Sequence, residues 1–151
     1  METTIRRAGT ADLDTLAPLF DRYRAFYTGQ DAPEQSREFI ADRLAKADSV
    51  VLLAADAESA LGFVQLYPMF SSVSAARVWV LNDLFVEAHA RRRGVARALL
   101  EAAEAFARDD GALRLELETD PDNRAAQTLY RATGWTPFDG TRRFRRALRP
   151  A

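Results

Sequence analysis

The chain has 151 residues, no cysteine, one histidine and a formal net charge of −1. The lack of cysteine excludes a disulfide framework, a thiolate zinc site and a cysteine nucleophile, and the single histidine excludes any site that needs two imidazoles. The length predicts one domain with a substantial core, and the hydrophobic fraction of 48% argues against disorder.

Charge and hydropathy also bear on partners and location. Acidic and basic residues are mixed along the chain, so the sequence carries no overall basic footprint for nucleic acid. No apolar run reaches the roughly 18–20 residues that a bilayer-spanning helix needs. The opening residues METTIRRAGTADLD lack the apolar core of a signal peptide. We expect a soluble, cytoplasmic protein with no membrane or nucleic-acid partner.

The first third of the chain predicts a strand followed by two helices. Thr3–Arg7 has the pattern of a short strand, and Thr10 is a candidate N-cap for a helix that reaches about Tyr27. A helix-breaking segment at 28–33 separates this helix from the next one. The apolar stripe of that second helix consists of Phe39, Ile40, Leu44 and Ala47.

Three strands are predicted next, at Val50–Ala55, Leu61–Phe70 and Arg77–Val86, and their short connections favour an antiparallel meander. A long amphipathic helix follows from Val95 to the breaker Asp109-Asp110-Gly111. It leads to a strand at 113–117. Because the connection between this strand and the strand at Arg77–Val86 contains a whole helix, it is long enough for the two strands to run parallel.

The last part of the chain predicts one more helix and a strand-forming tail. Asp120-Pro121-Asp122 opens the helix, Gly134 ends it, and one or two strands are expected within Trp135–Leu148. The sheet is therefore expected to be mixed in an α/β (α+β) fold. Because no linker divides the chain, residues 1–151 are predicted to form a single domain.

The segment richest in chemical information is Leu81–Val86 followed by Arg91-Arg92-Arg93-Gly94-Val95-Ala96-Arg97. A strand ends there, an arginine-rich loop turns, and a helix begins with small residues. The first helical turn has unpaired N–H groups and partial positive charge, and arginines add charge-assisted donors. These features point to an anionic phosphate ligand at residues 91–97.

A solvated arginine loop is the simpler alternative for the same segment. Two other phosphate motifs are excluded. No Gly-Lys-Ser/Thr follows, so the segment is not a Walker loop, and the G-x-G-x-x-G spacing of a dinucleotide site is missing.

The pattern Arg-x-x-Gly-x-Ala at 91–96, between an apolar strand and a helix, resembles the acetyl-CoA signature Gln/Arg-x-x-Gly-x-Gly/Ala of the GNAT N-acetyltransferase superfamily. The predicted order of elements is similar to that family's fold over nearly the whole chain. The stretch from Leu84 to Leu100 looks most like small single-domain amine or protein acetyltransferases. The resemblance implies a mixed six- to seven-stranded sheet flanked by about four helices, with acetyl-CoA as cosubstrate and no metal.

A second match lies at Asn123-x-x-Ala126-x-x-Leu129-Tyr130-x-x-x-Gly134-Trp135, and it resembles the family's Asn…Ala…Leu/Phe-Tyr…Gly-Phe pattern. Positions 123 and 130 are seven residues apart and share one helix face. In the family, the Asn contacts the pantetheine arm and the Tyr hydroxyl lies near the CoA sulfur. The simpler alternative is that Asn123 caps a helix and Tyr130 is a core aromatic.

Together the two motifs imply a set of acetyl-CoA-binding residues: Leu84, Phe85, Val86, Arg91, Arg92, Arg93, Gly94, Val95, Ala96, Arg97, Asn123 and Tyr130. The resemblance implies that Leu84 and Val86 bind through the main chain, and that an N–H near Phe85–Val86 stabilises the thioester oxygen. Tyr130 is the candidate general acid for the leaving thiolate. Since the chain lacks cysteine, direct transfer to the amine is expected.

The sequence does not identify the residue that acts as the general base. Similar spermidine/spermine acetyltransferases have Glu where this sequence has Asn82, which cannot accept a proton at neutral pH. Strand alternation places Asp83 on the opposite face from Asn82, where a structural role is favoured. A water chain, Glu118 or Asp31 could serve instead, and His89 has the pattern of a solvated loop residue.

The acceptor is expected to be a primary amine of a small molecule or peptide. In the family, the first two helices and their loop wall the acceptor site, and here that region combines aromatic and acidic side chains, which suits an amine or a cation. The candidate substrate residues are Tyr27, Asp31 and Asn82. The alternative is that the aromatic side chains of this region belong to the core and its acidic side chains are solvated. Trp79 is expected to be a core residue.

A homodimer through the C-terminal strands, with Phe138 and Phe144, is a further expectation.

Two other function classes stay open. A non-catalytic acyl-CoA-binding regulatory module on the same fold would need the 91–97 segment but no Tyr130. A transferase using another nucleotide would need an acidic residue at the end of the next strand, where Glu118 lies.

Overall fold

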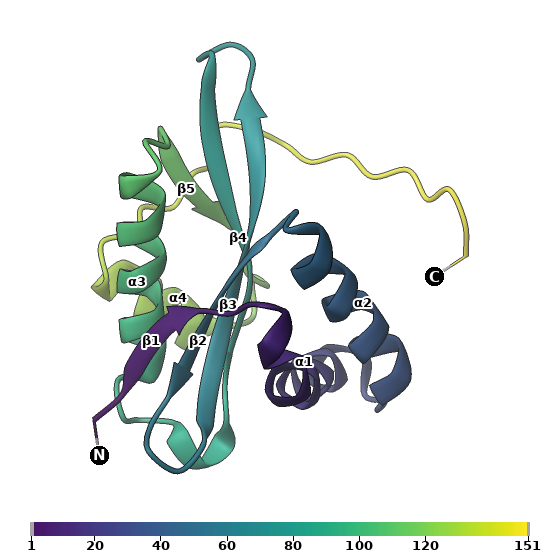
Figure 1. Ribbon diagram of the computed structural model, residues 1–151. Coiled ribbons are helices and arrows are strands. Elements are labelled where there is room, and N and C mark those ends of the chain that lie inside the picture. Colours follow the sequence, from purple (N-terminus) through teal and green to yellow (C-terminus); the bar gives the residue numbers. More distant parts are fainter. Residues whose placement is uncertain (1, 151) are drawn as a thin grey trace. The chain divides into compact units, whose positions relative to one another are not determined.

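The strands between residues 50 and 86 carry buried apolar side chains on both faces, and they form the centre of a five-stranded sheet in the computed structural model, which describes residues 2–150. The chain divides into two compact units, Met1–Glu118 and Thr119–Ala151, and the whole sheet lies in the first (Figure 1). No helix within residues 2–150 is both long and apolar enough to cross a membrane.

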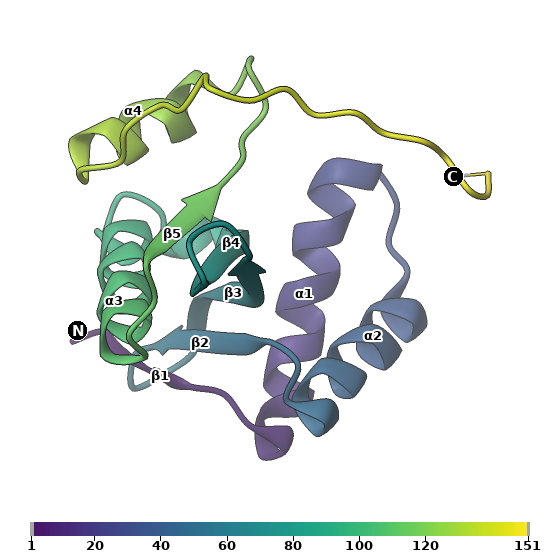
Figure 2. The ribbon, with the colours of Figure 1, turned by 90° about the horizontal axis from the view of Figure 1, so that it is seen from above.

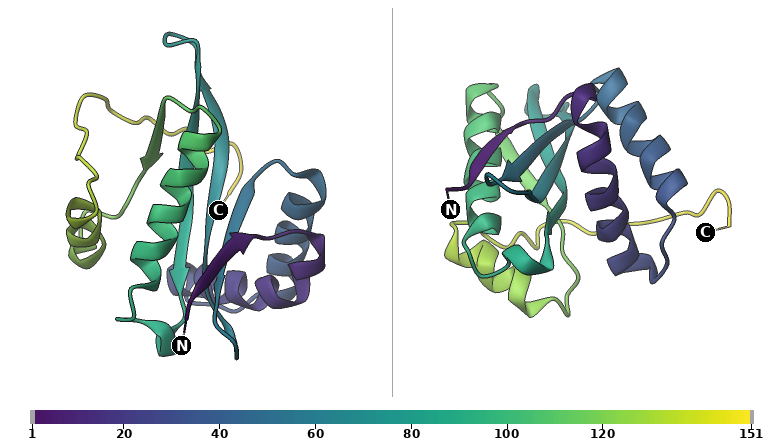
Figure 3. Two further views of the ribbon diagram at one scale, coloured as in Figure 1. Left: turned by 60° about the vertical axis from the view of Figure 1, so that its left-hand side comes forward. Right: turned by 60° about the horizontal axis from the view of Figure 1, so that its bottom comes forward.

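The strands lie side by side in chain order: β1 (Thr4–Arg7), β2 (Val50–Ala55), β3 (Ala60–Ser71), β4 (Ala76–Val86) and β5 (Arg114–Leu117). The first four pair antiparallel with their neighbours, and β5 runs parallel to β4. The mixed sheet and its parallel crossover are confirmed. The sheet has five strands among the described residues, fewer than the six or seven expected. Figure 3 shows β3 and β4 continuing together as a ribbon beyond β2.

Helices cover both faces of this sheet. The helices α1 (Leu13–Thr28) and α2 (Pro33–Lys46) lie on one face, and α3 (Val95–Asp109) lies on the other (Figure 2). Leu16, Phe20, Ile40, Leu53 and Phe63 pack together under α1 and α2. Short 3₁₀ turns occur at Thr10–Asp12 and Ala88–Ala90.

The start of α1 differs from the expected cap. Thr10 begins the 3₁₀ turn instead of capping a helix, and the Asp12 carboxylate accepts a hydrogen bond from the Gly9 N–H at 2.8 Å. Arg6 donates to the same carboxylate, which ties β1 to the helix entry. Both bonds stabilise the charged form of Asp12 and lower its pKa to about 2.

The β3–β4 ladder contains a β-bulge. Gln65 pairs with Asp83, but the next residue of β3, Leu66, pairs with Leu81. Asn82 is therefore an extra residue on β4, and such a residue breaks the strict alternation of side chains between the two faces. A Cβ added at Gly62, further along the same ladder, would lie 2.4 Å from the main-chain oxygen of Phe85, so β4 approaches β3 closely there.

β4 and β5 diverge before β4 ends. Their parallel ladder runs from Val78 and Arg114 to Leu81 and Leu117, while β4 continues to Val86. Along an antiparallel ladder, residues whose main-chain groups bond to the neighbouring strand alternate with residues whose main-chain groups point away from it. The Glu87 N–H donates to the Leu61 oxygen at 2.8 Å, so Glu87 is a position that bonds to the neighbouring strand. By this alternation the main-chain groups of Leu84 and Val86 point away from β3. Their predicted role in binding acetyl-CoA through the main chain stays a prediction.

The second unit contains the helix α4 (Arg124–Ala132). The predicted strands in Trp135–Leu148 are wrong, because residues 135–150 form no strand in the structure. The expectation rested on apolar residues in the tail, but Phe138 and Phe144 are 78% and 93% exposed. Without a neighbouring strand to pair their main-chain groups, apolar residues alone do not make a strand.

Candidate active site

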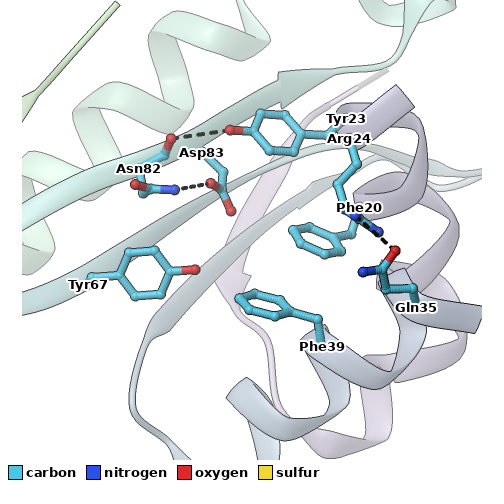
Figure 4. Close-up of a pocket in the computed structure, with 8 residues that line it drawn as sticks. All are labelled: Phe20, Tyr23, Arg24, Gln35, Phe39, Tyr67, Asn82 and Asp83. Carbon is cyan, nitrogen blue, oxygen red and sulfur yellow. Dashed lines mark hydrogen bonds between the residues drawn. The ribbon is translucent and has the colours of Figure 1, made fainter. Parts of the chain in front are cut away.

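An open pocket of about 300 Å³ lies between α1, α2 and the sheet, entirely within the first unit (Figure 4). This volume is at the small end of the range for sites that bind small molecules. The residues lining the pocket come from two helices and two strands: Phe20, Tyr23, Arg24, Gln35, Phe39, Tyr67, Asn82 and Asp83.

The bulge places Asn82 and Asp83 at the same pocket. Both line it, and the Asn82 Nδ2 donates to the Asp83 Oδ1 at 2.6 Å. The expectation that strand alternation turns Asp83 to the opposite face is therefore wrong, because the extra residue interrupts the alternation. The pocket thus contains a carboxyl group that sequence reasoning assigned to a structural role.

Asp83 belongs to a buried chain of hydrogen bonds. The Gln65 Nε2 donates to Asp83 Oδ2, and the Ser49 hydroxyl donates to Gln65 Oε1 at 2.8 Å, which holds the amide in that orientation. Gln65 is 0% exposed and Asp83 is 2% exposed. Burial raises the pKa of Asp83, and the hydrogen bonds from Gln65, Asn82 and Tyr23 oppose that rise. The result is a carboxyl that is more basic than an ordinary Asp.

Two tyrosines stand beside this carboxyl. The Tyr23 hydroxyl donates to the main-chain oxygen of Asn82 at 3.3 Å. Burial raises the pKa of Tyr23, and burial together with the charge of Asp83 raises the pKa of Tyr67 to about 12. Both hydroxyls stay protonated at neutral pH and can donate hydrogen bonds.

The helix side of the pocket is cationic. Arg24 donates from Nη1 to the Ser36 hydroxyl at 2.9 Å and from Nη2 to Gln35 Oε1 at 3.3 Å. Ser36 in turn donates to the Asp21 carboxylate at 2.6 Å, which leaves its lone pairs for Arg24. These bonds fix the guanidinium at the wall of the pocket.

Of the three residues predicted to contact substrate, one lies at the pocket and two lie outside it. Asn82 lines the pocket, whereas Tyr27 and Asp31 do not. Tyr27 is 65% exposed near the end of α1, and Asp31 is exposed in the loop between α1 and α2. Trp79 is 5% exposed and donates to Asp110 at 2.8 Å, which confirms it as a core residue.

The predicted phosphate segment forms a turn that leads into α3. Gly94 has φ +77° and a Cβ there would meet nothing within 4 Å, so the space before the helix is open. The Ala98 N–H donates to the Gly94 oxygen at 3.0 Å, and the N–H groups of Val95, Ala96 and Arg97 precede that bond. This is the arrangement of main-chain donors that anions bind.

The arginines of this turn differ in their contacts. Arg93 pairs with Asp56 at 3.3 Å, so it ties the turn to the β2–β3 hairpin. Arg91 donates to the Val86 oxygen at 3.3 Å. Arg92 and Arg97 are exposed. Within residues 2–150 the side chains of Arg92 and Arg97 make no hydrogen bond or ion pair, so these two cations can turn to a ligand.

In the second unit, Asn123 is the N-cap of α4. Its side chain accepts a hydrogen bond from the Ala126 N–H at 3.1 Å, which is the capping role considered as the simpler alternative. The Tyr130 ring lies 6.1 Å from the Trp135 ring. A role for either residue toward acetyl-CoA stays a prediction.

Sequence reasoning missed the residues that the tertiary fold brings together. Arg24, Gln35 and Tyr67 lie on three elements, and nothing local in the sequence links them. Asp83 did leave a signal: Asn82-Asp83 is a pair of adjacent polar residues within an otherwise apolar strand. Such a pair does not fit a two-residue alternation, and a bulge accommodates it.

Among residues 2–150, no group of three or more His, Asp or Glu side chains could hold a metal ion.

Comparison with known proteins agrees with this geometry. A model of the Acetyltransferase (GNAT) family matches residues 16–135. An uncharacterized N-acetyltransferase of Bacillus subtilis, YhfO, is 44% identical over 90% of this chain and 91% of its own length. An aminoglycoside N(6')-acetyltransferase type 1 of Klebsiella aerogenes is 32% identical over 80% of this chain and 81% of its own length.

Solved structures support the same assignment. The crystal structure of a probable acetyltransferase is 41% identical, with a TM-score of 0.92 over 98% of this chain and 99% of that one. The family match covers most of the chain, and it extends over the turn at 91–97 and the residues of β4 that line the pocket. The chain therefore belongs to the GNAT family of acetyltransferases.

Proposed function

We propose that this acetyltransferase moves the acetyl group of acetyl-CoA directly to a primary amine of a small molecule or peptide. The observation that carries the proposal is the course of β4. Along this one strand lie a buried carboxyl at the bulge and a diverging edge of main-chain groups, and the N-terminus of α3 follows it. These parts correspond to a proton acceptor, a pantetheine-binding edge and a diphosphate site.

Asp83 is the general base of the proposed reaction. The attacking amine must lose a proton as its nitrogen bonds to the thioester carbon and the carbon–sulfur bond breaks. Asp83 lines the pocket, and burial raises its pKa, so its carboxylate is a better proton acceptor than an exposed Asp. Asn82 and Gln65 hold the carboxylate by donating to its two oxygens.

The donor side uses main-chain groups. The outward groups of Leu84 and Val86 pair with the pantetheine arm, and an N–H near Phe85–Val86 stabilises the thioester oxygen. The turn at 91–94 and the N–H groups of Val95, Ala96 and Arg97 bind the diphosphate. Asn123 contacts the pantetheine arm, and Tyr130 protonates the leaving thiolate; both assignments rest on the family pattern.

The test is acetyl transfer by the purified protein. Acetyl-CoA is offered with amines, amino acids, aminoglycosides and peptides, and free CoA is measured with a thiol reagent, which the cysteine-free chain does not consume. Titration calorimetry against CoA, acetyl-CoA, NAD and ATP is run in parallel. We expect binding of CoA and acetyl-CoA and release of thiol with an amine.

Other outcomes support the alternatives. CoA binding without transfer to any amine would favour a regulatory acyl-CoA-binding module. Binding of NAD or ATP instead would favour a transferase that uses another nucleotide.

Three further expectations belong to this proposal. A single domain spanning residues 1–151 is supported by the family match at 16–135, which covers most of the first compact unit and continues into the second as far as residue 135. A homodimer would cover Phe138 and Phe144, which are exposed. Native mass at micromolar concentration tests the dimer, and a monomer would contradict it. A cytoplasmic location stays a prediction.

A further inference from the structure

The acceptor pocket carries opposite charges on its two sides. Asp83 lies on the strand side, and Arg24 lies on the helix side (Figure 4). The rings of Phe20 and Phe39 lie between them and are stacked 5.5 Å apart. A pocket that selects polyamines would be expected to carry acids on every side, because a second ammonium group needs a second anion.

Arg24 is held in place and still has donors to offer. Its two hydrogen bonds go to neutral oxygens of Ser36 and Gln35, and among residues 2–150 it has no ion-pair partner. A guanidinium has five N–H donors, so most of them are unused by the protein. Asp21 lies behind Ser36 and strengthens the support of Arg24 from outside the pocket.

Gln35 adds a second donor on the same side. Because its Oε1 accepts from Arg24, its NH₂ group is the part left for a ligand, and Figure 4 shows that nitrogen on the pocket side. A guanidinium beside an amide NH₂ presents donors only. This combination recognises a carboxylate, and it repels an ammonium group.

We propose that the acceptor is an amine that also carries a carboxylate, as in an amino acid. Its amino group faces Asp83 and its carboxylate faces Arg24 and Gln35. An apolar stem joins them over Phe20 and Phe39. The inference rests on the proposed function, since it names the acceptor class for the same pocket. It separates this chain from its relative named as an aminoglycoside acetyltransferase, since an aminoglycoside would bring further cations to Arg24.

The test compares acceptors in matched pairs. ω-Amino acids from glycine to 6-aminohexanoate are compared with unbranched alkylamines of equal carbon number, and lysine and ornithine are compared with cadaverine and putrescine. We expect kcat/KM for thiol release to be about 10- to 100-fold higher with the carboxylate, the effect of a hydrogen bond to a charged group. One chain length should be best, because the distance from Asp83 to Arg24 is fixed.

Variants assign the preference to Arg24. In Arg24→Met the advantage of the carboxylate should fall to a few-fold or less, mainly through KM. The control is Arg37→Met, because Arg37 lies on α2 outside the pocket and pairs with Asp14 at 2.6 Å. Its carboxylate preference should equal that of the unmodified protein. The pairwise comparison in the unmodified protein stands even if Arg24→Met fails to fold.

The outcomes separate the two proposals. Equal or higher rates with the alkylamines, diamines or aminoglycosides overturn the acceptor class and leave the proposed function standing. A carboxylate preference that survives in folded Arg24→Met overturns the role of Arg24. If CoA binds but calorimetry shows binding of neither member of any pair, the acceptor class is wrong. If neither CoA binding nor thiol release occurs, the proposed function itself fails.

Discussion

The pocket between α1, α2 and the sheet and the turn at 91–94 lie next to each other along the chain, at β4 and directly after it, but they are built in different ways. The turn at 91–94 and the start of α3 are one continuous segment, and their donors are mostly main-chain N–H groups. The pocket takes its side chains from α1, α2, β3 and β4. One region is therefore specified by local sequence, and the other depends on how four elements pack.

This difference predicts how each region responds to mutation. A main-chain site is insensitive to most side-chain changes and sensitive to bulk or charge placed among its N–H groups. A pocket assembled from side chains loses one chemical role at a time. The variants below use that distinction, beginning with the largest expected effect.

Asp83→Asn should give one of the two largest losses, together with Tyr130→Phe. The amide cannot take a proton from the amine at neutral pH, so kcat should fall by roughly 10²–10⁴-fold, the usual contribution of a general base. The affinity for CoA should change little, because the turn at 91–94, where the diphosphate is proposed to bind, is untouched. Single-turnover transfer and CoA calorimetry measure the two effects.

The control for this variant is Asp42→Asn, an exposed acid on α2 that lies 3.8 Å from Lys46. It should keep full activity. A folded Asp83→Asn protein with unchanged kcat would show that the amine loses its proton to another group, and water would then be the best candidate.

Tyr130→Phe tests the residue that the sequence pattern alone assigned. The change removes one hydroxyl and keeps the ring, so packing should change little. If Tyr130 protonates the thiolate, kcat should fall by roughly 10²–10⁴-fold while acetyl-CoA affinity stays nearly constant. The loss should shrink with an acyl donor whose leaving thiol is more acidic. A fall in affinity instead would mean that the hydroxyl holds the thioester.

Gly94→Glu tests the main-chain site. The new side chain places negative charge and bulk where the diphosphate is expected, so CoA affinity should fall by about 100-fold, which corresponds to losing charge-assisted hydrogen bonds. Calorimetry measures the affinity. The matched control is Gly111→Glu after the other end of α3, because Gly111 has a similar φ of +79° and is equally open. Equal losses in both variants would indicate backbone strain instead of a diphosphate site.

The same distinction explains what the sequence could predict. The helix at 95–109 and the first four strands could be predicted from local sequence patterns. Gly94 could be singled out for the same reason, because its neighbours in sequence are its neighbours in space, and its role toward a diphosphate stays a prediction. Asp83 was placed on the wrong face, because one inserted residue reverses the alternation and sequence periodicity does not locate it. No local sequence pattern indicated that Arg24 and Gln35 would lie at the pocket. The strands expected in the tail failed for a related reason, because a strand depends on a partner.

The smallest effect should come from Gln65→Met, and it concerns the pH dependence of the pocket. Gln65 donates to the Asp83 carboxylate, and this bond favours the charged form and so opposes the rise in pKa caused by burial. Methionine has a similar length and no donor, so the pKa of Asp83 should rise further. Since the base acts when ionised, the acid limb of kcat/KM should move to higher pH by roughly half a unit to one unit, as expected for the loss of about 1 kcal/mol.

On that limb the variant should be about 3- to 10-fold less active than the unmodified protein, and the two should converge at high pH, where Asp83 is ionised in both. Ser49→Ala is the graded control. It keeps the Gln65 donor and removes the bond that orients it, so its shift should have the same direction and a smaller size. A stability change without any movement of the limb would mean that Gln65 only fills space in the core. A movement to lower pH would contradict the assignment of Asp83 as the titrating base, because losing a donor cannot stabilise a carboxylate.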